Sequence, residues 1–95
     1  MFKKNEKPFS KGQKVHVTDL GHVYTCYSQF ALRHPKYILR WSYRAMPNTS
    51  RKFVILGVHK HCMPEQYDSN KWCIAIQDTV NNAIYFIGER GLGPI

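Results

Sequence analysis

The sequence has 95 residues, of which 43% are apolar and 14% aromatic, and its formal net charge is +8. This length favours one domain with a single modest core and excludes a deep catalytic cleft between two lobes. The composition excludes a disordered chain, and the longest apolar run, residues 53–58, is too short to span a bilayer.

Residues 1–10 are rich in lysine and have no periodicity, which predicts a flexible or loosely docked basic arm ahead of a single domain at residues 11–95. Residues 13–19 alternate polar and apolar side chains, which predicts a short half-buried strand with Val15 and Val17 facing inward. Asp19-Leu20-Gly21 then predicts a turn.

A short helix is predicted before Pro35, with Thr25 or Ser28 as its N-cap. The residues that share one face at helical spacing are Tyr27, Phe30, Ala31 and His34. Residues 36–44 fit either a strand or an irregular excursion, and residues 47–50 have the composition of a loop.

Two further strands are predicted from apolar runs. Residues 52–59 are β-branched and apolar, which indicates a central strand with a bend or bulge at Gly57. Residues 72–77 alternate large and small side chains, so Trp72, Ile74 and Ile76 share one face.

A hairpin is predicted to join the strand at residues 72–77 to a further strand at residues 83–87. Asn81 and Asn82 tolerate positive φ, which favours a tight connection there. Residues 88–94 are punctuated by glycine and predict a turn that returns Leu92 to the core.

The expected fold is mostly β. Four to five short strands with one short helical insertion fit a small, bent antiparallel sheet, and closure into a barrel removes exposed edges. An SH3-like barrel is the preferred architecture and an OB-like barrel the second. An edge left open would allow dimerisation by strand addition.

Several stretches resemble small bacteriophage-encoded SH3-like proteins. The opening resemblance lies in residues 11–17 (KGQKVHV) and 21–27 (GHVYTCY), and the closing one in residues 53–59 (FVILGVH), 72–77 (WCIAIQ) and 85–92 (YFIGERGL). The sequence departs from the pattern of these proteins at residues 33–52, where the segment is longer than that pattern usually needs. The resemblance implies a fold and a viral setting, not an activity.

The sequence offers little for catalysis, so we predict a non-enzymatic protein without a cofactor. No pair of carboxylates has a spacing suited to acid–base chemistry, no serine or cysteine has the context of a nucleophile, and no glycine loop precedes a helix. A zinc site is a minority alternative. Its four ligands would be His59, His61, Cys62 and Cys73, but Cys73 lacks a second ligand nearby.

Residues 33–52 form the candidate binding segment, because they hold six cations and no acid, interleaved with aromatic rings. Nucleic-acid binding needs cations for phosphates and planar groups for bases. The candidate residues are Arg33, Lys36, Tyr37, Arg40, Trp41, Tyr43, Arg44, Arg51 and Lys52. An extended segment would turn its rings into the core and only its charges outward, whereas a loop would present both sets together.

The preferred ligand is nucleic acid, bound by a cytoplasmic phage-type protein. The alternative is a host-takeover or anti-defence protein that inhibits a host protein, such as a nucleic-acid-handling or CRISPR effector, by direct binding. Arg, Tyr and Trp also dominate protein interfaces, so composition alone supports both ligands. Three cysteines are typical of reduced thiols rather than a disulfide scaffold, and no membrane partner is expected.

Overall fold

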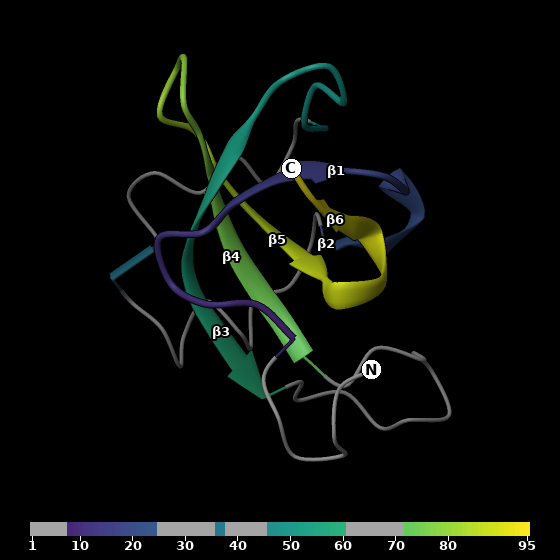
Figure 1. Cartoon of the computed structure of the whole chain (residues 1–95), viewed down its shortest axis with the longest axis vertical. Helices are drawn as coiled ribbons and strands as arrows, with labels where there is room; N and C mark the ends of the chain where they lie inside the picture. Colours follow the sequence, from purple (N-terminus) through teal and green to yellow (C-terminus); the bar gives the residue numbers. More distant parts are fainter. Residues whose placement is uncertain (1–7, 25–35, 38–45, 61–71) are drawn as a thin grey trace.

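The described part of the protein folds as a six-stranded antiparallel sheet. The computed structural model describes residues 8–24, 36–37, 46–60 and 72–95. Its elements in chain order are β1 (Lys14–Val17), η1 (Leu20–His22), β2 (Val23–Tyr24), β3 (Phe53–Lys60), β4 (Trp72–Asp78), β5 (Ile84–Gly88), η3 (Glu89–Gly91) and β6 (Leu92–Pro94). The two η elements are short 3-10 helices. The strand order is β2-β5-β4-β3-β1-β6 (Figure 1).

The mostly-β class is therefore confirmed, and the described strands form an open sheet with β2 and β6 at its two edges. The expected strands at 13–19, 52–59, 72–77 and 83–87 correspond to β1, β3, β4 and β5. The predicted helix before Pro35 lies outside the described residues. In the part of the chain that is described, no helix has the length and apolar character needed to cross a membrane.

Strand β3 contains the bulge that its glycine predicts. The register with β4 pairs Ile55 with Ile76 and then Gly57 with Ala75, so Leu56 is the extra residue. Because side chains alternate along a strand, the extra residue reverses which face the following side chains occupy. Phe53 and Ile55 reach the core before the bulge, and Val58 reaches it after.

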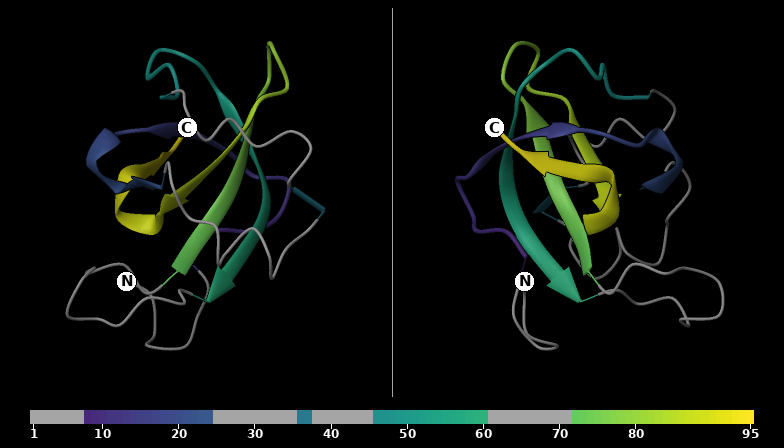
Figure 2. Two further views of the ribbon diagram at one scale, coloured as in Figure 1. Left: turned by 180° about the vertical axis from the view of Figure 1, so that it is seen from behind. Right: turned by 45° about the vertical axis from the view of Figure 1, so that its right-hand side comes forward.

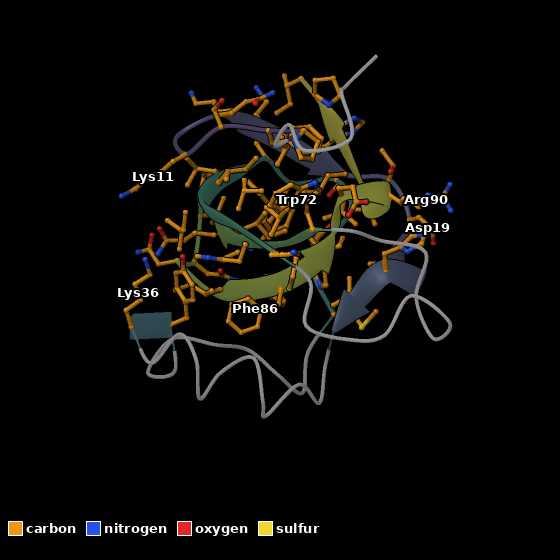
Figure 3. The ribbon with its side chains drawn as sticks, turned by 90° about the horizontal axis from the view of Figure 1, so that it is seen from below. Lys11, Asp19, Lys36, Trp72, Phe86 and Arg90 are labelled. Carbon is orange, nitrogen blue, oxygen red and sulfur yellow. The ribbon has the colours of Figure 1, made fainter. Side chains whose placement is uncertain are left out.

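The main core lies on the inner face of the curved sheet. Val15 and Val17 face inward from β1, as predicted, and pack with residues of β3, β4, β5 and β6. Trp72 packs against this cluster on the same face as Ile74 and Ile76. Figure 3 shows Trp72 within the curve of the sheet and Phe86 on the outer side of β5. Phe9, within the predicted arm, also packs on this core.

The outer face of the long strands is buried as well. Cys73 and Ala75 of β4 and Ile84 and Phe86 of β5 form a second cluster with Tyr37, which comes from the segment between β2 and β3. All five residues of β5 are buried as a result. The uninterrupted apolar run at residues 83–87 is the sequence signature of a strand covered on both faces.

Strands β1 and β6 join the two ends of the fold. Val15, His16 and Val17 pair with Pro94, Gly93 and Leu92 in turn, and Figure 2 shows the two strands side by side. Leu92 returns to the core as predicted, but the tail is a strand rather than only a turn. Strand β2 was likewise not expected.

Two turns that the sequence predicts are present in the structure, one at Asp19 and one between β4 and β5. Asp19 begins η1 as its N-cap, and its side chain accepts a hydrogen bond from the Gly21 N–H at 2.9 Å. The β4–β5 hairpin has Asn82 at φ 63°, the left-handed conformation that asparagine tolerates.

Candidate nucleic-acid interface

The structure describes four of the nine residues predicted to bind a ligand. Lys36 and Lys52 are exposed, Arg51 is half-buried and Tyr37 is buried. The other five lie outside the described residues, and they are Arg33, Arg40, Trp41, Tyr43 and Arg44. The four described residues do not form one surface, because Tyr37 packs on the outer face of β5 while Arg51 and Lys52 precede β3.

Tyr37 belongs to the core rather than to a surface on which bases would stack. Its side chain is 4% exposed, and its ring meets that of Phe86 edge to face at a centroid separation of 5.5 Å. Its Oη lies 2.9 Å from His59 Nε2. Burial, together with Cys73, raises the pKa of the Tyr37 phenol above its ordinary value, so the phenol keeps its proton at neutral pH.

Lys36 lies beside this buried ring, with Nζ 5.1 Å from the Tyr37 centroid. That separation is within the range of a cation–π contact. Both residues lie in a 3-10 turn, so at these two positions the segment is not a strand.

Arg51 and Lys52 are held in place by the end of β4 and the hairpin that follows it. Arg51 Nη1 lies 3.1 Å from Asp78 Oδ2. The Lys52 carbonyl accepts hydrogen bonds from the Thr79 hydroxyl at 3.0 Å and the Thr79 N–H at 3.3 Å. Figure 1 shows the loop before β3 and the β4–β5 hairpin projecting from the same end of the sheet.

Asp78 is a buried carboxylate, 1% exposed. Burial by itself would raise the pKa of Asp78, but hydrogen bonds from the Val80 N–H, the Arg51 guanidinium and the Asn81 N–H outweigh it and lower the pKa below its ordinary value. The carboxylate is therefore ionised at neutral pH, and it fixes both the hairpin and Arg51. The sequence alone gives no signal of this pairing.

The register of β1 brings two further basic side chains to Lys52. Lys14 pairs with Val54 and Val15 with Phe53, and His16 and Lys52 line the same surface depression. Val15 and Val17 face the core, so Lys14 and His16 point outward and are exposed. Lys14, His16, Arg51 and Lys52 together are here called the basic face.

The basic face contains a shallow depression of about 280 Å³. It is lined by His16, Thr49, Ser50, Arg51, Lys52, Pro94 and Ile95. None of these has an acidic side chain, and the neighbouring Asp78 is buried beneath Arg51. Among the described residues the Lys14 and Lys52 ammonium groups make no ion pair.

The described charges are distributed unevenly around the molecule. Figure 3 shows Lys11 and Lys36 on one side and Asp19 with Arg90 on the opposite side. Glu89 accepts a hydrogen bond from the Trp72 N–H at 3.0 Å, and Asp19 contacts His22 at 3.5 Å. Neither of these two acids is among the residues that line the depression.

The zinc alternative involves two residues outside the described part, His61 and Cys62. Of the other two, His59 and Cys73 are directly paired across β3 and β4, and His59 contacts Tyr37. Within the described ranges no three metal-binding side chains come together.

No protein-family model, no curated protein sequence and no solved structure matches this chain.

Proposed function

We propose that this protein binds nucleic acid without catalysing a reaction and that the basic face contacts the phosphate backbone. The observation that carries the proposal is the meeting of His16, Arg51 and Lys52 at a depression lined by no acidic side chain. Lys14 is exposed on the outward side of β1, close in sequence to His16 of this depression. Cations that neutralise phosphates release condensed counterions, which is the main source of affinity in such complexes.

We also propose that the protein is an SH3-like barrel of the small bacteriophage type and acts in the host cytoplasm. Three features support this architecture: the strand order β5-β4-β3-β1-β6, the pairing of β1 with β6, and the bulge in β3. The bulge increases the local bend and twist, which is how a small sheet curves towards closure.

The experiment is a titration of nuclease-treated protein against labelled single- and double-stranded oligonucleotides at about 50 and 150 mM salt. Two variants with the same change in charge locate the site: Lys14→Glu with Lys52→Glu, and Arg40→Glu with Arg44→Glu. We expect the first variant to weaken binding at least about tenfold and to reduce the salt slope by about 2, because each lysine–phosphate contact contributes about 1.

The second variant tests the prediction from sequence that residues 33–52 form the interface. Loss of binding in Arg40→Glu with Arg44→Glu alone would move the site from the basic face to that segment. Circular dichroism of both variants is the control, since Lys14 and Lys52 are exposed and the fold should survive their replacement. If the unmodified protein binds no oligonucleotide at either salt concentration, the proposal is wrong and inhibition of a host protein takes its place.

A further inference from the structure

The depression on the basic face is built from three separate parts of the chain. His16 comes from β1, Thr49 to Lys52 from the loop before β3, and Pro94 with Ile95 from the end of β6. Its volume of about 280 Å³ is just below the 300–1,000 Å³ typical of pockets for whole small molecules. A depression of this size suits one unit of a polymer whose remainder extends over the surface.

One side of the depression offers donors. Asp78 contacts Arg51 through Nη1, and a guanidinium has five N–H donors in all, so most of them remain available on a side chain that is 35% exposed. The Lys52 ammonium has no hydrogen-bond or ion-pair partner among the described residues. These two cations suit a phosphate oxygen.

The side chains on the other side of the depression are less polar. Pro94 and Ile95 are exposed there, Ile95 at 63%. The His16 ring lies against Gly93, because a Cβ added at Gly93 would come within 2.7 Å of His16 Nε2. A sugar ring packs well against such apolar groups and an imidazole.

Contacts within the protein hold the loop that lines the depression. Asn48 Oδ1 accepts hydrogen bonds from the Ser50 N–H at 2.9 Å and the Ser50 hydroxyl at 2.7 Å. The Asn48 carbonyl accepts one from the Arg51 N–H at 3.1 Å, and Asp78 holds the Arg51 side chain. A preformed loop loses little entropy on binding, which favours affinity.

We infer that this depression binds one sugar-phosphate unit of the nucleic-acid backbone, with the phosphate at Arg51 and Lys52 and the sugar on Pro94, Ile95 and His16. The inference rests on the proposed function and adds that recognition at this site does not involve a base. It follows that a backbone lacking bases should still occupy the depression.

The test compares a single-stranded oligonucleotide with an abasic deoxyribose-phosphate oligomer of the same length. The full chain is labelled with ¹⁵N, any tag is placed before Met1, and amide shifts are followed by NMR. We expect both oligomers to shift the amides of His16, Thr49, Arg51, Lys52 and Ile95. Lys52→Gln should weaken both about three- to tenfold and lower the salt slope by about 1.

Lys60→Gln is the matched control, because Lys60 is an exposed lysine at the far end of β3, the strand that Lys52 precedes. Equal effects of Lys52→Gln and Lys60→Gln, with oligonucleotide binding intact, would overturn this inference and leave the proposed function standing. Amide shifts at the depression that appear with the oligonucleotide but not with the abasic oligomer would also overturn this inference, because the site would then contact a base. Failure of both oligomers to bind would remove the proposed function and this inference together.

Discussion

Replacing Asp78 with asparagine isolates the ion pair that holds the loop before β3. The carboxylate accepts from the Val80 N–H at 2.7 Å and from Arg51 Nη1 at 3.1 Å. The amide oxygen of asparagine can still accept from the Val80 N–H. Its NH₂ group would face Arg51, and since both groups are hydrogen-bond donors, the bond to Arg51 is lost. A hydrogen bond to a charged partner contributes about 1.5–3 kcal/mol. Arg51 is 35% exposed and water compensates in part, so we expect a loss of about 2 kcal/mol in the free energy of unfolding.

The pH dependence of this loss tests its electrostatic origin. The pKa of Asp78 is lowered in the folded protein, whereas an aspartate in an unfolded chain has a pKa of about 3.9. The ion pair therefore stabilises the fold fully above about pH 4, and this contribution is lost as the pH falls through the lower, folded value. The difference between wild type and Asp78→Asn should shrink accordingly in acid.

Urea denaturation at pH 7 and at pH values below 4 measures both quantities. A double-mutant cycle with Arg51→Gln then separates the pair from the bonds to the hairpin, and we expect a coupling of about 1–2 kcal/mol at pH 7. A difference below about 0.5 kcal/mol at pH 7, or one that stays constant as the pH falls below 4, would refute the assignment of Asp78 as the ionised anchor of Arg51.

Two further predictions concern the second core and the hairpin. Gly57→Ala should lower the free energy of unfolding by about 2–3 kcal/mol, because its Cβ would lie 2.5 Å from Tyr37 Oη and 2.7 Å from His59 Nε2. Gly57→Ala should cost less free energy of unfolding in a Tyr37→Phe background, which lacks the Tyr37 hydroxyl. Urea titrations in which the two substitutions have strictly additive costs would contradict a contact between this Cβ and Tyr37 Oη. Asn82→Ala should cost about 1 kcal/mol because Asn82 has φ 63°, whereas Asn82→Gly should be close to neutral; thermal melts that rank Gly below Ala would contradict the turn geometry.

Local signals predicted four of the six described strands. The bulge at Gly57 and the positive φ at Asn82 follow from residue types whose backbone preferences act within a few residues. Strands β2 and β6 were missed because they have two and three residues, and β6 contains both glycine and proline. Their pairing with β5 and β1 decides that they are strands, and no local pattern encodes it.

The candidate site was predicted only in part for the same reason. Arg51 and Lys52 belonged to a charge cluster visible along the sequence. Lys14 and His16 had been expected only as the polar positions of a strand, and the β1–β3 register is what brings them to Lys52. Tyr37 was expected on the surface if its segment formed a loop, yet it fills the outer face of β5 because Phe86 and Cys73 leave an apolar surface there.

The position of β1 between β3 and β6 also governs when the protein can fold during its synthesis. β1 leaves the ribosome early, but its two neighbours are encoded at residues 53–60 and 92–94. Until residue 94 has emerged, one edge of β1 stays open and the core lacks Leu92. Folding dominated by such distant pairings takes milliseconds to seconds. A nascent chain stalled before residue 92 would therefore expose an apolar edge to neighbouring chains. Pairing of residues 92–94 with β1 covers this edge, and so it protects the growing polypeptide from aggregation.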